Sequence, residues 1–101
     1  MKPSNLLKIE TLTDQWLDKD VIILHACFQL LSDCIEKENL LNGHIDWSAE
    51  EDSQKAKNEI ELLHHWWIHR KTKTVELGEK QYEEDNQMLK KLIDIRKYLW
   101  T

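Results

Sequence analysis

Glycine and proline are nearly absent from this 101-residue sequence, which holds two glycines and one proline. Average proteins contain roughly 7% glycine and 5% proline. Because tight turns depend on these residues, few turns are expected, and a sheet with several hairpins is hard to build. Good helix formers such as leucine, lysine and glutamate dominate instead. The sequence therefore predicts an all-α fold, and its length predicts a single helical domain over residues 1–101.

Long apolar runs and a surplus of basic charge are also missing. The longest apolar run, Val21–Leu24, is far shorter than the roughly 20 residues that cross a membrane. The first residues also lack the apolar stretch of a secretory leader. The net charge of −5 opposes binding to nucleic acid, and the mixing of acids with lysines argues against a DNA mimic. We therefore expect a cytoplasmic protein with no nucleic-acid partner and no membrane role.

The only cysteines, Cys27 and Cys34, lie seven residues apart on one predicted helix. At about 1.5 Å rise per residue, their Cα atoms are roughly 10 Å apart. A disulfide requires less than about 7 Å, so the two cannot pair within one chain. Both lie among apolar residues and are predicted to be reduced thiols, as is usual in the cytosol.

Three antiparallel helices are predicted, over residues 20–39, 49–73 and 79–100, after an N-terminal arm of residues 1–19. The alternation within the arm is weak, which indicates an extended segment or a short strand.

Two of the predicted helices begin with recognisable capping residues. Asp20 is predicted to be the N-cap of the first helix. Ser48 and Glu51 have the spacing of a capping box for the second helix. In the linker before it, the apolar residues Ile45 and Trp47 are expected to fold back onto the core.

The helix over residues 20–39 is apolar around more than half of its circumference. One apolar row consists of Val21, Leu24, Phe28, Leu31 and Ile35. A second row consists of Ile23, Cys27, Leu30 and Cys34. The polar stripe left for water consists of His25, Gln29, Asp33 and Glu36. An ordinary surface helix has an apolar arc of little more than 100°. We therefore expect burial on two sides, at least one of them by another chain, and hence a homo-oligomer, with a dimer favoured.

Several polar and aromatic residues are candidates for an interface or a ligand pocket. In the polar stripe these are His25, Gln29 and Asp33. A histidine on a mostly buried helix is more often a hydrogen-bonded structural residue than a ligand. The aromatic candidates are Trp47, Trp66, Trp67 and Trp100. Because no arginines are interleaved with them, they are predicted to anchor the core or an interface and not to stack on bases.

Metal chemistry is a weaker alternative. His65 and His69 have the i, i+4 spacing of metal-binding pairs, and Glu61 precedes them by one turn on the same face. This set would suit a metal-dependent hydrolase, but further ligands are lacking, and a solvent-exposed histidine face is favoured. No metal or cofactor is therefore predicted.

Other enzyme classes are excluded by missing motifs. All-α nucleotide pyrophosphohydrolases need a Glu-x-x-Asp motif, and no glutamate here has an aspartate three residues later. The two glycines cannot form a glycine-rich phosphate loop. We therefore expect a protein that is not an enzyme.

Six segments together resemble short, functionally uncharacterised proteins encoded by tailed bacteriophages. They are Leu24–Leu31, Glu36–Glu38, His44–Trp47, Trp66–Trp67, Leu92–Arg96 and Tyr98–Thr101. The resemblance covers roughly residues 20–101 and implies no particular activity. Asp94 and Arg96 belong to the shared pattern and are predicted to form a buried salt bridge, with a role in a site as the alternative. The His64, His65 and His69 cluster lies outside it.

The functional expectation is a non-enzymatic phage accessory protein that works through protein–protein contact. Its setting would be host take-over or counter-defence in the host cytoplasm, with a host or phage protein as a further partner. The alternative is a small-ligand binder that holds a nucleotide or metabolite between subunits, using His25, Arg96 and tryptophan faces.

Overall fold

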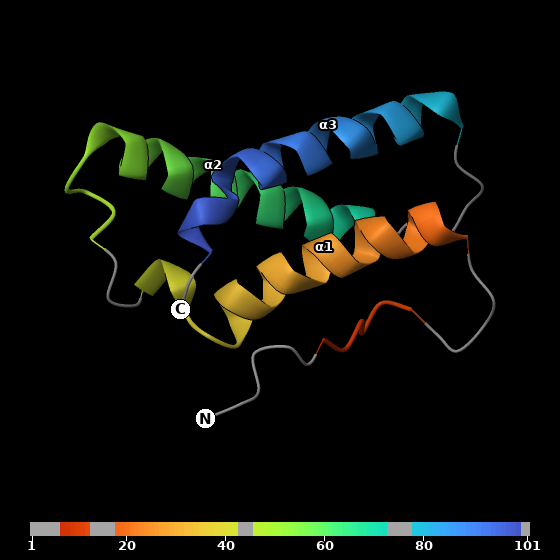
Figure 1. The fold of residues 1–101 in the computed structure, drawn as a ribbon, viewed down its shortest axis with the longest axis horizontal. Coiled ribbons are helices and arrows are strands. Elements are labelled where there is room, and N and C mark those ends of the chain that lie inside the picture. The colour runs from red at the N-terminus through yellow and green to blue at the C-terminus, as the bar shows by residue number, and fades with distance from the viewer. Residues whose placement is uncertain (1–6, 13–17, 43–45, 73–77, 100–101) are drawn as a thin grey trace.

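The computed structural model describes residues 7–12, 18–42, 46–72 and 78–99. Three α-helices make up most of these residues: α1 (Lys19–Glu36), α2 (Glu51–Arg70) and α3 (Glu79–Ile95). Two short 3-10 helices, Leu40–Asn42 and Arg96–Tyr98, follow α1 and α3. The described residues contain no strand, and the helices pack against one another (Figure 1). The predicted all-α fold is therefore confirmed.

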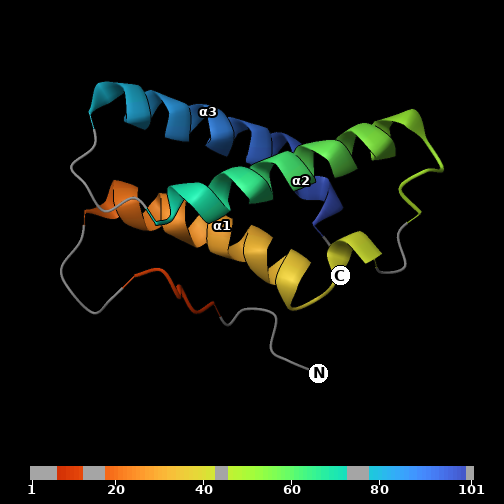
Figure 2. The same ribbon diagram turned by 180° about the vertical axis from the view of Figure 1, so that it is seen from behind.

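The three helices alternate in direction along the chain. In Figure 1, α1 and α3 lie in front of α2, and in Figure 2 the same bundle is seen with α2 in front. The ring of His25, near the start of α1, lies 4.9 Å from that of Trp67, near the end of α2. This contact fits the antiparallel arrangement. Among the described helices, α2 covers one face of the bundle, and α1 and α3 make the opposite face (Figures 1 and 2).

The core forms where apolar residues at helical spacing meet between the helices. α1 contributes Leu24, Phe28 and Leu31; α2 contributes Ala56, Ile60, Leu63 and Trp67; α3 contributes Met88, Leu92 and Ile95. Phe28 stacks on Trp67 with 5.0 Å between the ring centroids. The linker adds Leu40 and Trp47, so the expected return of Trp47 to the core is confirmed. Ile45 lies outside the described residues.

The ends of α1 differ from the prediction. The N-cap is Asp18, and Asp20 lies within the first turn. The helix ends at Glu36, three residues before the predicted end. The backbone amides of Lys37 and Glu38 both donate to the carbonyl oxygen of Asp33, and Asn39 then adopts a left-handed φ of 56°. Asparagine tolerates this conformation better than most residues, which explains why the helix stops there.

The predicted capping box of α2 is wrong. The Ser48 hydroxyl and amide both donate to Asp46 Oδ1, at 2.7 and 3.0 Å. This local turn takes the side chain that would have capped the helix. Glu50 becomes the N-cap, and α2 runs from residue 51 to residue 70 where the prediction was 49–73.

The third helix is also shorter than predicted. It ends at Ile95, and the chain tightens into the 3-10 helix Arg96–Tyr98 where continuation to residue 100 was predicted. Tightening of the last turn is a common way to end a helix.

Residues 7–12 are the described part of the predicted N-terminal arm. They form a turn, in which the Leu12 amide donates to the Ile9 carbonyl at 3.3 Å, and not a strand. Glu10 forms an ion pair with Lys37, the residue directly after α1, at 2.8 Å. Within the described residues, no helix combines the length and the apolar character that crossing a membrane requires.

Candidate functional site

The polar stripe of α1 does not face water along its whole length. His25 and Gln29 are buried, because residues of the N-terminal segment cover them. Thr11 Oγ1 lies 2.6 Å from His25 Nδ1, and the Glu10 amide donates to Gln29 Oε1 at 3.1 Å. The expectation that this stripe is solvent-exposed is therefore wrong for these two residues. Their polar atoms are satisfied by their own chain, as is usual for buried polar groups.

Asp33, the third candidate of the stripe, is half-buried and belongs to the same network. Its Oδ1 accepts a hydrogen bond from Gln29 Nε2 at 2.9 Å and lies 3.3 Å from Lys37 Nζ. These contacts hold Gln29 in place, and Gln29 in turn holds the amide of Glu10. The role of Asp33 in this structure is to fix the N-terminal segment on α1.

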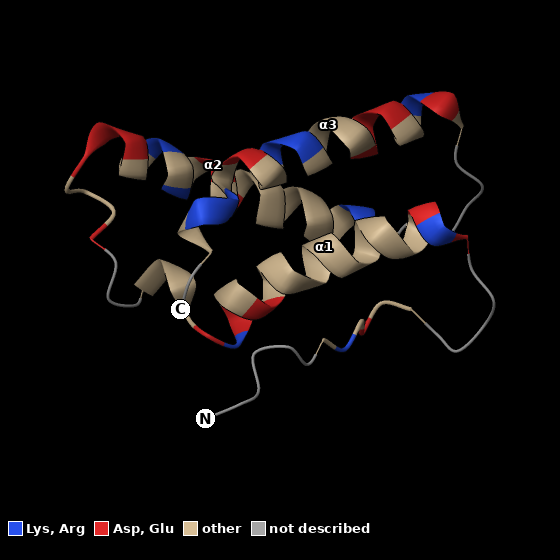
Figure 3. Cartoon of the chain, viewed as in Figure 1, with Lys and Arg blue, Asp and Glu red and all other residues tan. Residues whose placement is uncertain are grey.

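The exposed side of α1 is the second apolar row. Ile23 is 57% exposed and Leu30 is 50% exposed. Figure 3 shows that the charged residues of α1 are confined to its two ends. Cys27 and Cys34 lie half-buried in the same row. Burial raises the pKa of both thiols, that of Cys34 to about 11, so both are protonated at neutral pH and poorly reactive.

Two exposed apolar residues of α3, Tyr82 and Ile93, point to the same side of the bundle as the exposed apolar row of α1. Residues two apart on a helix point in nearly opposite directions, about 200° from each other. Glu84 accepts a hydrogen bond from Trp66 of α2, so Tyr82 points away from α2. Lys91 pairs with Glu59 of α2, so Ile93, two residues later, also points away from α2.

The same geometry applies to α1. His25 and Phe28 contact Trp67 of α2, so Ile23 and Leu30, each two positions away, point away from α2. Ile23, Leu30, Tyr82 and Ile93 are therefore called the α1–α3 face, and each of them is at least half exposed. A surface with several large exposed apolar side chains is typical of an interaction site.

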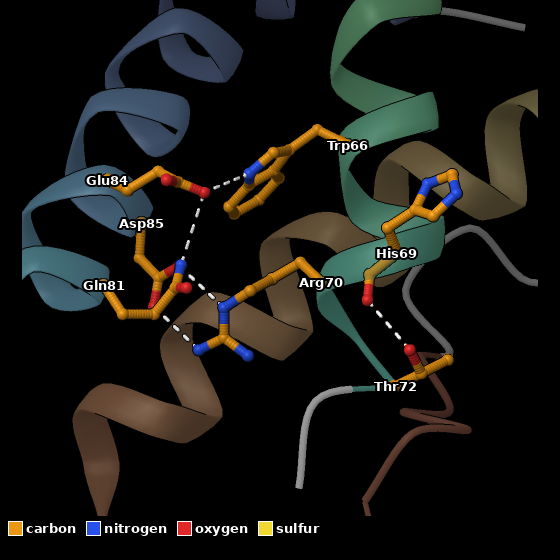
Figure 4. A network of polar contacts seen from close by, with 7 residues as sticks. All are labelled: Trp66, His69, Arg70, Thr72, Gln81, Glu84 and Asp85. Carbon is orange, nitrogen blue, oxygen red and sulfur yellow. Dashed lines mark hydrogen bonds and ion pairs between the residues drawn. The ribbon is translucent and has the colours of Figure 1, made fainter. Parts of the chain in front are cut away.

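A pocket of about 430 Å³ opens at one end of the bundle, where α1 and α3 begin and α2 ends. Arg70 and Asp85 form its charged base and are both buried. Arg70 donates from Nε and Nη2 to the two carboxylate oxygens of Asp85, each at 2.8 Å (Figure 4). Gln81 Nε2 adds a hydrogen bond to Asp85 at 3.0 Å. This two-pronged geometry fixes both charges at the α2–α3 junction.

His25 lines the same pocket. Burial lowers its pKa, and the neighbouring positive charge of Arg70 lowers it further against a smaller opposite effect of Asp85. The imidazole is therefore neutral at pH 7. Its ring meets the ring of Trp67 edge-on, at 78° between the planes. His25 thus connects the N-terminal segment, the core and the pocket.

Sequence reasoning missed the Arg70–Asp85 pair and predicted a buried pair of Asp94 and Arg96 instead. That prediction is wrong, because Asp94 and Arg96 are both exposed. A signal for the true pair was present in the helical spacing. Arg70 continues the core row of α2 three residues after Trp67, and Asp85 lies three residues before the core residue Met88.

The tryptophans divide between core and surface. Trp67 is fully buried, whereas Trp66 is half-buried and donates from Nε1 to Glu84 at 2.7 Å. Trp47 is buried, and its Nε1 has no hydrogen-bond partner among the described residues. Trp67 and Trp47 are thus core residues, whereas Trp100 lies outside the described residues.

The weak metal candidates do not converge. Glu61, His65 and His69 are all exposed on α2, and His69 Nδ1 lies 2.9 Å from the carbonyl oxygen of His65. In the part of the chain that the structure describes, no three His, Cys, Asp or Glu residues form a cluster that could hold a metal ion. These three residues therefore do not form a metal site in this structure.

His25 and Arg96 do not share a site within one chain. His25 lies at the end of the bundle where α3 begins, whereas Arg96 follows the last residue of α3. A ligand held by one chain could therefore not contact both.

The comparisons with known proteins do not assign a function to this chain. No protein-family model matches the sequence, and searches of curated proteins and of solved structures gave no match either. The resemblance to tailed-phage proteins therefore stays a prediction.

Proposed function

We propose that this protein is a non-enzymatic, homodimeric helical protein that acts through protein–protein contact, and that two copies pair through the α1–α3 face. The observation that carries the proposal is the exposure of Ile23, Leu30, Tyr82 and Ile93 on the side of the bundle away from α2. A second copy presents the same apolar residues, so a two-fold arrangement would cover both sets at once.

The make-up of this face suits a protein partner. The middle of α1 carries no charged residue, and depletion of charge is typical of the centre of an interface. Charged residues lie at both ends of α1 and along the whole length of α3, beside the uncharged middle of α1 (Figure 3). An apolar centre with a polar rim is the usual anatomy of an interface that forms from soluble subunits.

A pair of matched variants tests the dimer. Leu30→Glu places a charge at the centre of the proposed interface, whereas Leu62→Glu places it on a residue of α2 that is 47% exposed, close to the 50% of Leu30. Sedimentation equilibrium at micromolar concentrations should show a dimer for the wild type and for Leu62→Glu. Leu30→Glu should be a monomer, since a desolvated unpaired charge is costly. A monomeric wild type, or equal effects of the two variants, would contradict the proposal.

The setting that we propose is the cytoplasm of an infected host cell, where the dimer contacts a host or phage protein. The resemblance of residues 20–101 to short tailed-phage proteins supports it. Affinity purification of the wild type and of Leu30→Glu from infected cells would separate partners of the dimer from partners of the monomer.

A further inference from the structure

The pocket at the end of the bundle adjoins the α1–α3 face at Tyr82 and has a charge distribution of its own. Its volume of about 430 Å³ falls in the range of small-molecule sites, roughly 300–1,000 Å³. The inference drawn from it goes beyond the proposed dimer and does not depend on it.

The base of the pocket holds two nitrogen atoms without hydrogen-bond partners among the described residues. Arg70 is only 7% exposed, and Asp85 occupies its Nε and Nη2. Among the described residues, nothing accepts a hydrogen bond from its Nη1. His25 is similarly buried, with Nδ1 held by Thr11 and with no hydrogen bond to Nε2 from any described residue. Neither nitrogen belongs to the fully buried atoms that lack a partner, so both are accessible, and Arg70 Nη1 can donate to a ligand that brings an acceptor such as a carboxylate.

The mouth of the pocket has the opposite character. Asp18 and Asp20 line it, both are exposed, and neither has a cationic partner among the described residues. Their charges repel a simple anion and attract an ammonium group. A ligand that satisfies the base must therefore carry a positive charge at its other end.

The wall between base and mouth is apolar. Val21 and Leu24 of α1 and Leu89 of α3 line the pocket. This wall suits a hydrocarbon side chain. We propose that the pocket binds a small zwitterion with the chemistry of an apolar α-amino acid, with its carboxylate at Arg70 and its ammonium group at Asp18 and Asp20.

Three probes with the same hydrocarbon chain test the proposal. Leucine carries both charges, leucinamide carries only the ammonium group, and 4-methylpentanoate carries only the carboxylate. Titration of the ¹⁵N-labelled protein should show leucine binding roughly tenfold more tightly than either analogue, because each analogue loses one charged contact. The shifted amides should include those of Val21 and Gly78, which line the pocket. No binding at millimolar leucine, or leucinamide binding as tightly as leucine, would overturn it.

A charge-neutral variant locates the ammonium group. Asp20 Oδ1 accepts a hydrogen bond from the Val21 amide, and Asp20→Asn keeps that acceptor while removing the charge. We expect it to weaken leucine binding roughly fivefold, the effect of one partly exposed ion pair, without weakening 4-methylpentanoate. Asp52→Asn is the matched control, an exposed acid in the first turn of α2. Equal leucine affinities of the two variants would overturn the placement of the ammonium group.

Discussion

At the scale of single residues, several buried polar groups of the bundle are held by partners from the same chain, whereas Trp47 Nε1 and His64 Nε2 are buried without a hydrogen-bond partner among the described residues. Arg70 and Asp85 neutralise each other, and His25 and Gln29 bond to the N-terminal segment. Buried charges are expensive to remove from water, so such pairs are tolerated when their geometry is good and costly to break on one side. The effect of a substitution on stability therefore depends on whether it leaves a buried charge without its partner.

Asp85→Ala should lower the free energy of unfolding by about 3–5 kcal/mol, because Arg70 would remain buried without its partner. The double variant Arg70→Met with Asp85→Leu should lose much less, since no charge is left behind. Urea unfolding followed by circular dichroism measures both. As a control, Lys55→Ala removes the exposed pair with Glu51 and should cost at most about 0.5 kcal/mol. Equal losses in the single and double variants would show that burial of unpaired charge is not the cause.

Acid should destabilise the protein below about pH 6.5, the ordinary pKa of histidine. The pKa of His25 and that of His64 are both lowered in the folded state, chiefly by burial. The unfolded chain therefore binds more protons, so stability is full above pH 6.5 and falls as pH drops through the folded-state values. Each group contributes a slope of at most about 1.4 kcal/mol per pH unit.

Urea unfolding between pH 8 and pH 5 measures this loss. The range stays above the region where Glu10 and Asp46, whose pKa values are lowered, become protonated. His25→Gln should show a shallower decline than the wild type because one of the two histidine contributions is gone. An unchanged slope in this variant would rule out His25 as a source of the acid sensitivity.

At the scale of the elements, sequence spacing predicted the helices well and their ends poorly. The core residues of α1 and α2 could be predicted from apolar periodicity, because the spacing of apolar residues indicates which face of a helix meets the rest of the protein. The ends depend on competition between local hydrogen bonds, as at Ser48, whose side chain bonds to Asp46 and does not cap α2. The burial of His25 and Gln29 could not be predicted either. It depends on Glu10 and Thr11, which lie before α1 in the sequence and fold back over that helix.

The alkylation rate of the two cysteines of α1 indicates whether the exposed apolar row of this helix is covered by another chain. Their raised pKa values already make alkylation slow at pH 8. In the proposed dimer the row is buried further, so Cys27 and Cys34 should react with iodoacetamide several-fold more slowly in the wild type than in Leu30→Glu. Mass spectrometry of timed samples gives the rates. Equal rates at micromolar concentration would indicate that the α1 row is not in the interface.

At the scale of the whole molecule, the two proposed sites adjoin each other at Tyr82, which belongs to the α1–α3 face and also lines the pocket. The α1–α3 face lies away from α2, whereas the pocket lies where α2 ends against the first turns of the other helices. Helix α1 contributes to both, through Ile23 and Leu30 on its exposed row and through Val21 and Leu24 at the pocket. Variants at the face and in the pocket can therefore be combined to ask whether dimerisation and ligand binding influence each other.

The alternating direction of the helices also has a kinetic consequence. Each helix packs antiparallel to the next one in the chain, so the first contacts close only short loops, and loop closure is entropically cheap. Helical bundles of this kind fold in microseconds to milliseconds. Subunit association at typical rates takes about 0.1–10 s at micromolar concentration. For the proposed dimer, encounter between two finished chains would therefore set the time from synthesis to the working protein.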